Sequence, residues 1–354
     1  MTSTTTGTIT RVDPRSDPLW ARLAGSCPGN VFTSPPWLRA VCGTYGFTPE
    51  ARIVHADDGE PAAGVAFVDL DDVRGRRRTS LPFCDRADPL VRDPYAWPAL
   101  ARDVARDAAH DGVPWTLRRV AGELGDGWVL RETGRQALHT TPLDGDLDEL
   151  HARLHPGARR NLRAAAAHGV TVRASSTPEA VRVVHAMHAE LRRGKYRMLA
   201  PPLSFFENVR AEFAGDDAVV VLTAVADGTP IAAGLFLIWR DTLYYKVGAS
   251  DPAGLRARPN DALFWAAVEW AVGRGLREID WGVSDLDQPG LIAYKRKWAS
   301  AEEQVVRLSP AGPARPATSG ADQLLHGLTD LLTRHDVPHD VTVQAGALLY
   351  RYFG

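Results

Sequence analysis

Lysine is nearly absent from this chain, and its few positions draw attention. Of 41 lysines and arginines in 354 residues, only Lys195, Lys246, Lys295 and Lys297 are lysines. A compact ammonium group and a planar guanidinium are not interchangeable. We therefore expect some of these lysines to fill positions that require an ammonium group. The alternative for Lys295 and Lys297 is a pair of solvated charges on a helix face.

Other absences exclude whole classes of protein. The three cysteines, Cys27, Cys42 and Cys84, form no CxxC pair, so neither a disulfide framework nor a structural zinc site is expected. The N-terminal residues have no apolar core of a signal peptide, and no apolar run approaches the ~18 residues of a membrane span. With a formal net charge of −2, any contact with a polyanion must be local. We expect a soluble, cytoplasmic protein.

The length predicts two domains of about 150 residues each and a tail. We expect a flexible start over residues 1–16, a first domain over 17–146 and a second over 147–310. Residues 311–354 are expected to form a linker and a helical tail, which packs on the body or mediates oligomerisation. The tail carries an apolar stripe of five leucines: Leu324, Leu325, Leu328, Leu331 and Leu332.

The second half shows the clearer order of elements. Tight turns at Asp227-Gly228 and Arg240-Asp241 predict an antiparallel meander of strands at 218–226, 231–239 and 242–249. Helices are expected before the meander, and Asn260 is expected to cap a helix that follows it. The turn at Asp58-Gly59 echoes the one at Asp227-Gly228, which suggests a duplication, although shared hairpin chemistry would also explain it.

The stretch 278–298, EIDWGVSDLDQPGLIAYKRKW, organises the chemistry. It begins as a buried strand, breaks at Gly282, and passes through a polar loop into a cluster of aromatic and basic side chains. Functional residues often lie on loops, and the strands next to these loops provide the rigid scaffold that positions them. We therefore expect a functional site after this strand.

Several short segments, taken in order, carry a resemblance to a known family. In the second half they are ARRNLRAAAAHGV (158–170), RRGKYRML (192–199), ADGTPIAAGLFL (226–237), LYYKVGAS (243–250), EWAVGRGLREIDWGVSD (269–285) and GLIAYKRKWAS (290–300). In the first half they are PPWLRAV (35–41) and SLPFCDRADPLV (80–91).

Together these segments resemble the GNAT acyltransferase fold, and more narrowly the tandem-GNAT Fem family of FemAB- and FemX-like aminoacyltransferases that build peptidoglycan bridges. The resemblance covers about residues 30–310 and rests on order and spacing. It implies an α+β fold with two GNAT-type domains in tandem, each a mixed, mostly antiparallel sheet flanked by helices, and a short helical tail.

The resemblance also bears on the acyl donor. In GNAT enzymes a glycine-rich loop and a helix N-terminus cradle the pyrophosphate of acyl-CoA. The matching residues here include Pro259, which lacks an N–H donor, and Asp261, which adds negative charge. Fem relatives share this loss and use aminoacyl-tRNA. The resemblance therefore implies aminoacyl-tRNA as co-substrate, an amine-bearing acceptor such as a peptidoglycan precursor or peptide-like metabolite, and no cofactor.

Two residues are expected to be catalytic by this resemblance. Lys295 matches the lysine that stabilises the oxyanion, although a structural role or a tRNA-phosphate contact remains open. Asp85 matches an aspartate that would touch the acceptor amine. Further residues are expected to bind substrate, against structural alternatives for each: Arg160, Asn161, Arg163, Lys195, Tyr196, Arg197, Tyr245, Asn260, Ser284, Tyr294, Lys297 and Trp298.

Two other functions remain open: an acyl-CoA-dependent N-acyltransferase acting on a sugar or small metabolite, and an inactive scaffolding protein of cell-envelope assembly. Metal binding is not expected. His185 and His188 have helical i, i+3 spacing, but no third ligand is evident.

Overall fold

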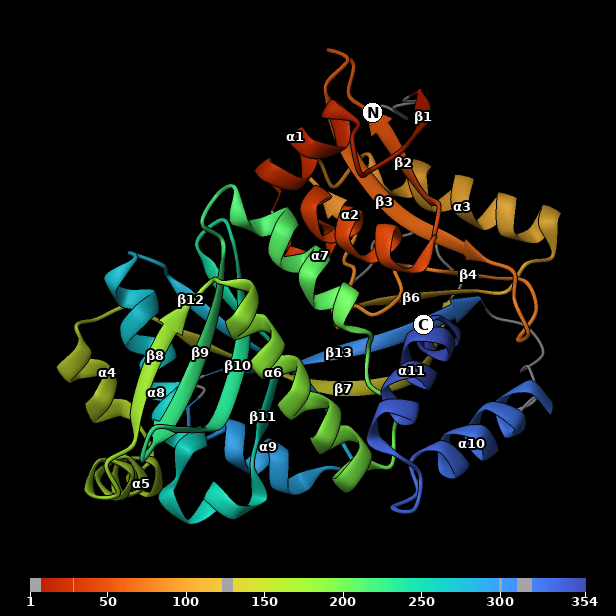
Figure 1. The fold of residues 1–354 in the computed structure, drawn as a ribbon. Helices are drawn as coiled ribbons and strands as arrows, with labels where there is room; N and C mark the ends of the chain where they lie inside the picture. The colour runs from red at the N-terminus through yellow and green to blue at the C-terminus, as the bar shows by residue number, and fades with distance from the viewer. Residues whose placement is uncertain (1–7, 28, 123–129, 299–300, 311–319) are drawn as a thin grey trace. The chain divides into compact units, whose positions relative to one another are not determined.

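The computed structural model describes residues 8–27, 29–122, 130–298, 301–310 and 320–354 (Figure 1). The chain forms two compact units. The first comprises residues 1–136, 304–322 and 354, and the second comprises 137–303 and 323–353. The division therefore falls ten residues before the boundary expected at 146/147, and most of the tail belongs to the second unit. The reason is that β7 (Leu130–Pro142) and β13 (Ala301–Pro310) each contribute residues to both units.

The first unit is a sheet with helices. Its strands follow the order β1-β2-β3-β4-β6-β13, with β5 paired to β3, and all these pairs are antiparallel except β4 with β6. The elements are β1 (Ile9–Val12), α1 (Pro18–Ser26), η1 (Val31–Thr33), α2 (Pro35–Tyr45), β2 (Pro49–His55), β3 (Pro61–Leu70), β4 (Arg77–Thr79), β5 (Leu90–Val91), α3 (Trp97–Asp111) and β6 (Trp115–Val120).

Local signals explain the helix starts in this unit. Ser34 caps α2, as its position before two prolines predicts, and Asp17 caps α1. The apolar face of α3 packs on β2 and β3 through a core that includes Leu100, Val104 and Phe67. Leu100 and Val104 are four residues apart in α3, so their side chains lie on the same face of the helix.

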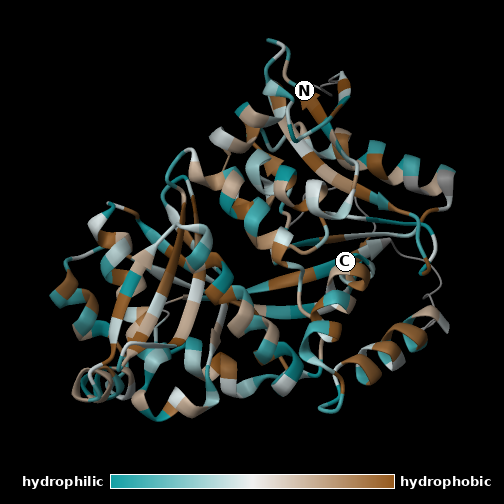
Figure 2. Cartoon of the chain, viewed as in Figure 1, coloured by the Kyte–Doolittle hydropathy of each residue, from teal (hydrophilic) through white to brown (hydrophobic). Residues whose placement is uncertain are grey.

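The second unit contains the expected meander. Strands β9, β10 and β11 are antiparallel neighbours, β8 pairs with β9, and β12 pairs in parallel with β11. Apolar residues dominate the middle of this sheet (Figure 2). The elements are α4 (Leu147–Arg153), α5 (Pro156–Ala167), β8 (Thr171–Ser175), α6 (Pro178–Leu191), η2 (Arg192–Tyr196), α7 (Leu203–Ala214), β9 (Val219–Ala226), β10 (Thr229–Trp239), β11 (Thr242–Ser250), η3 (Pro252–Ala257), α8 (Pro259–Gly273), β12 (Glu278–Asp285) and α9 (Pro289–Lys295).

The parallel pair β11/β12 is short. Its register covers only Thr242–Tyr244 against Glu278–Asp280. Beyond these residues the strands are no longer paired with each other, and Tyr245 of β11 lies 6.2 Å, ring centre to ring centre, from Trp281 of β12. The candidate site is built around this point, where aromatic side chains replace backbone hydrogen bonds.

The tail forms α10 (Gly320–Leu332), α11 (His339–Leu349) and η4 (Tyr350–Phe353). A helical tail was expected and is present, but only part of the five-leucine stripe lies on its buried face. Leu325 is buried with Thr329 and Thr333, whereas Leu324 and Leu331 are exposed. Leu328 and Leu332 are half-buried on the same side as this row of i, i+4 spacing. The leucine pattern therefore identifies the buried face, but it also includes two exposed positions.

The described residues contain neither a candidate membrane span nor a candidate metal site. No helix there is long and apolar enough to cross a membrane, and no group of three or more His, Cys, Asp or Glu could hold a metal ion. His185 and His188 are buried instead, where both pack against Phe206 and His185 bonds the carbonyl of Pro201.

Candidate functional site

Lys295, the last residue of α9, is buried with 4% exposure. Its Nζ donates to the carbonyl oxygens of Gly282 (2.9 Å) and Val283 (3.0 Å). Gly282 has a φ of 73°, which favours glycine, and its N–H is held by the carboxylate of Asp280 at 2.7 Å. The glycine break in β12 thus turns two successive carbonyls toward the ammonium group. Lys295 is therefore not a solvated charge.

Three charged or titratable side chains lie next to Lys295. His139 of β7 contacts the carboxylate of Glu302 at 3.0 Å, and Arg296 donates two hydrogen bonds to the same carboxylate at 2.6 and 2.8 Å. Burial lowers the pKa of His139, and the charge of Lys295 lowers it further. His139 and Glu302 are 163 residues apart, so no local sequence pattern could have found them.

A buried carboxylate occupies the first turn of α8. Asp261 is 5% exposed and accepts a hydrogen bond from Asn161 Nδ2 at 3.1 Å. Burial raises the pKa of Asp261, partly opposed by this hydrogen bond and then by the charge of Lys297. Asn260 does not cap the helix as expected. The helix begins at Pro259, two residues earlier than a cap at Asn260 implies, and Asn260 Nδ2 instead donates to Ser250 Oγ at 3.3 Å.

Aromatic rings connect Asp261 to the parting strands. Phe264 of α8 stacks on Trp281 of β12 at 4.3 Å and also contacts Tyr245, Tyr294 and Trp298. Burial raises the pKa of Tyr245, and burial followed by the charge of Asp261 raises that of Tyr294. One cluster of rings thus contains the predicted residues Tyr245, Tyr294 and Trp298. For Tyr245, this ring packing is the structural alternative that the sequence left open.

The remaining cations of the cluster sit over tyrosine rings. Lys297 Nζ lies 5.7 Å from the centre of the Tyr294 ring, and Lys195 Nζ lies 5.1 Å from that of Tyr196. Both Lys195 and Tyr196 are exposed on the π-helical turn η2. Helix α6 leads into this turn and packs on β11, the strand that carries Tyr245, and after burial the phenol of Tyr196 contributes to the raised pKa of Tyr245. The turn therefore borders the cluster.

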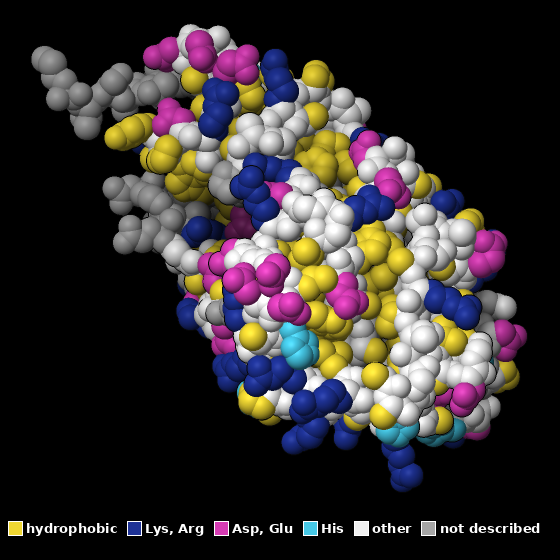
Figure 3. Space-filling view, turned by 90° about the vertical axis from the view of Figure 1, so that its left-hand side faces the viewer, with side chains coloured by type: hydrophobic (Ala, Val, Ile, Leu, Met, Phe, Trp, Pro, Cys, Tyr) yellow, Lys and Arg dark blue, Asp and Glu magenta, His cyan; other side chains and the backbone are white. Residues whose placement is uncertain are grey.

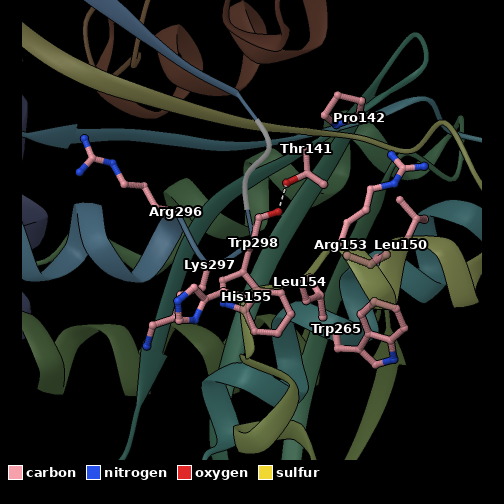
Figure 4. Close-up of a pocket in the computed structure, with 11 residues that line it drawn as sticks. Thr141, Pro142, Leu150, Arg153, Leu154, His155, Trp265, Arg296, Lys297 and Trp298 are labelled. Atoms are coloured by element: carbon pink, nitrogen blue, oxygen red, sulfur yellow. Dashed lines mark hydrogen bonds between the residues drawn. The ribbon is translucent and has the colours of Figure 1, made fainter. Parts of the chain in front are cut away.

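A cavity of about 250 Å³ adjoins this cluster (Figure 4). Its walls are largely apolar, and the two guanidinium groups of Arg153 and Arg296 lie on opposite sides of it in Figure 4. Among the described residues its lining contains no acidic side chain. The lining residues are Thr141, Pro142, Leu150, Arg153, Leu154, His155, Trp265, Val268, Arg296, Lys297 and Trp298. Of these, only Lys297 and Trp298 were expected at the site.

The predicted polar residues of α5 divide into two kinds. Asn161 faces inward to Asp261, whereas Arg160 and Arg163 are exposed. Figure 3 looks onto the side of the molecule that carries α4 and α5, and Lys and Arg side chains gather toward the bottom of this face. This placement suits a contact with an anionic partner and also suits solvent.

The last three predicted residues are Asp85, Arg197 and Ser284. Asp85 belongs to the first unit, in a loop after β4. Arg197 donates to the carbonyls of Thr333 and Asp330 in the tail. Ser284 is 2% exposed on β12, and its Oγ has no hydrogen-bond partner among the described residues.

The cluster has chemical properties that suit acyl transfer. It offers a buried ammonium group at Lys295, and it holds a buried carboxylate at Asp261 in an environment of aromatic rings. A positive group in a site from which water is excluded stabilises developing negative charge far better than it does in water.

Comparisons with known proteins agree with this geometry. Residues 152–296 match the family model described as an acetyltransferase (GNAT) domain. A search of curated protein sequences finds no match. Among solved structures, FemX is similar with a TM-score of 0.67 and 14% identity, covering 91% of this chain and 100% of FemX.

Two further structures show the same fold. L-PGS from Bacillus licheniformis has a TM-score of 0.52 and 17% identity, covering 90% of this chain and 98% of L-PGS. A tandem GNAT protein from the clavulanic acid biosynthesis pathway has a TM-score of 0.51 and 16% identity, covering 87% and 99%. The predicted fold is thus confirmed: the chain has the Fem-like tandem GNAT fold, and its GNAT domain identifies it as an acyltransferase.

Proposed function

We propose that this protein transfers an aminoacyl group from aminoacyl-tRNA to the amine of a peptidoglycan precursor or a peptide-like metabolite. In this reaction the amine nitrogen forms a bond to the ester carbonyl carbon. The bond from that carbon to the ribose oxygen of the tRNA breaks, and the ribose hydroxyl leaves with a proton. The product is an amide.

The buried carboxylate of Asp261 is the observation that favours aminoacyl-tRNA over acyl-CoA as the donor. A helix N-terminus binds phosphate through free N–H groups and its positive dipole end. Here the first helical residue is Pro259, which has no N–H, and the first turn holds a carboxylate fixed by Asn161 at 3.1 Å. A pyrophosphate placed there would meet a buried carboxylate that repels it. This favours a donor that does not depend on this helix end.

The site residues take roles that fit the transfer. Lys295 would stabilise the oxyanion of the tetrahedral intermediate, which requires an N–H of its ammonium group to reach the substrate. Lys195, Lys297, Arg160 and Arg163 would contact phosphates of the tRNA acceptor end, a local contact consistent with the net charge of −2. Asp85 would contact the acceptor amine.

A transfer assay tests this proposal. Purified protein is incubated with a pool of radiolabelled aminoacyl-tRNAs and a panel of amine acceptors, with and without ribonuclease. We expect ribonuclease-sensitive label in the acceptor, with a reaction rate that falls as salt rises. Absence of transfer from every tRNA, together with thiol release from acyl-CoA, would contradict the proposal.

The second candidate is an acyl-CoA-dependent N-acyltransferase. The family model that matches residues 152–296 is described as an acetyltransferase domain, and this favours it. The variant Asp261→Asn separates the two candidates. If acyl-CoA is the donor, removing the negative charge lowers the KM for acyl-CoA. If aminoacyl-tRNA is the donor, the variant gains no activity with acyl-CoA.

A further inference from the structure

The turn that carries Lys195 and Tyr196 has an unusual backbone. Residues Arg192–Tyr196 form a π-helical turn, and Arg197 after it has a φ of 54°. Both features are sparsely populated, occur often at functional sites, and persist only where the surroundings hold them. The N–H groups of Arg197 and Met198 both bond the carbonyl of Arg192. Something outside the turn must therefore keep it in this conformation.

Two arginines that flank the exposed pair tie the turn to the tail. Arg193 donates to the carbonyls of Arg334 (3.0 Å) and Val337, and Arg197 donates to those of Asp330 (3.2 Å) and Thr333. These carbonyls lie at and beyond the C-terminal end of α10. The last carbonyls of a helix have no partner within it and favour a positive charge. The two guanidinium groups thus complete α10 while α10 fixes the turn.

The tail is itself fixed close to this turn. Thr342 of α11 bonds the carbonyl of Leu332 at 2.7 Å, which joins α11 to the end of α10. Gly346 of α11 packs directly on the chain after the turn, and a Cβ added to it would lie 2.4 Å from the carbonyl oxygen of Ala200. Only a glycine allows this approach.

We infer that the C-terminal tail is a positioning element of the acyl-transfer site. Through Arg193 and Arg197 it holds the π-turn, so that Lys195 and Tyr196 are presented beside Tyr245 with their conformation already set. This role rests on the proposed function in one respect: Lys195 and Tyr196 are taken to contact the acyl donor. Presetting a binding loop improves affinity because less conformational entropy is lost on binding.

The chain offers a matched pair of variants to test this. Gly346→Ala and Gly327→Ala each place an alanine inside a tail helix, but a Cβ at Gly327 meets nothing within 4 Å. Both gain the same helix propensity, so they differ only in the clash with Ala200. Each variant is made in the full chain.

Hydrogen exchange provides the first measurement and does not depend on the reaction. We expect the amides of residues 192–198 to exchange at least about tenfold faster in Gly346→Ala than in the wild type, as in local opening of a cooperative segment, and to be unchanged in Gly327→Ala. Equal protection in all three proteins would overturn the inference.

Steady-state kinetics provide the second measurement, with whichever donor is active. We expect Gly346→Ala to raise the KM for the donor about fivefold or more at nearly constant kcat, the pattern of lost binding interactions. A wild-type KM despite faster exchange would also overturn the inference. If Gly346→Ala does not fold, the same two measurements are made on Arg197→Lys. This variant keeps the positive charge but loses the bidentate contact with the two carbonyls of the tail. Failure of transfer from tRNA would refute the proposed donor and leave the exchange result to decide the role of the tail.

Discussion

Replacement of Lys295 by alanine should destabilise the second unit severely, apart from any effect on catalysis. The ammonium group is buried and donates to two main-chain carbonyls at 2.9 and 3.0 Å. Hydrogen bonds that involve a charged group contribute about 1.5–3 kcal/mol each, so Lys295→Ala should cost about 3–6 kcal/mol. For a unit of this size, each kcal/mol lowers Tm by about 2–4 °C. The expected decrease is therefore about 6–24 °C.

Lys297→Ala is the matched control, two residues along the chain. Lys297 is half-buried, and its described side-chain contact is with the ring of Tyr294 at 5.7 Å. A cation–π contact of this kind contributes about 0.5–1 kcal/mol. Scanning calorimetry gives the two Tm values, and hydrogen exchange in β12 assigns the shifted transition to the second unit. Equal Tm values for the two variants would refute the structural role of Lys295, and a loss of activity in Lys295→Ala could then be ascribed to chemistry.

Three further predictions follow from buried polar groups. Burial raises the pKa of Asp261, so the folded state binds a proton more tightly than the unfolded state does. The stability of the wild type therefore falls as pH rises from about 3.8 through the folded pKa. Asp261→Asn should remove this decrease in urea unfolding measured across pH, and an unchanged pH profile would contradict the prediction. Arg52→Met should cost the first unit about 3–5 kcal/mol, because the fully buried Arg52 pairs with Asp107 and two other carboxylates; unfolding near the wild-type midpoint would show that the pairs contribute little. Thr141→Val should cost about 1–3 kcal/mol, since Thr141 Oγ1 accepts from Trp281 Nε1 at 2.9 Å and donates to a main-chain carbonyl, whereas Thr141→Ser should be nearly neutral; similar costs for both would point to packing.

The elements of the second unit were predictable because their signals are local. The meander follows from apolar runs separated by turns at Asp227-Gly228 and Arg240-Asp241, and each strand end in the structure lies within two residues of the expected one. Asp227 and Gly228 both have positive φ, as does Gly59 in the corresponding turn of the first unit. Both turns thus form hairpins, as their sequences indicate.

The partners of the site residues were not predictable, because they depend on long-range packing. The carbonyls that bind Lys295 come from β12, and they face it only because Gly282 adopts a positive φ. Asn161 and Asp261 lie 100 residues apart, and only the packing of α5 on α8 brings them to 3.1 Å. Asn161 was expected to bind substrate, and Asp261 was expected to place a negative charge in the loop that matches the pyrophosphate site, but neither expectation indicated that the two side chains bind each other.

The structure gives a physical reason why one of the few lysines is a lysine and not an arginine. All four lysines lie in the second unit, but only Lys295 is fully buried among them. Its ammonium group fits between two successive carbonyls, 2.9 and 3.0 Å away. A guanidinium group at this position would bring five N–H donors in a rigid plane into the same buried space, and any donor left without an acceptor there would cost free energy. Arginine is thus disfavoured at position 295 by geometry. The same buried setting would strengthen the effect of the ammonium group on an oxyanion, if the carbonyl of the substrate reaches it.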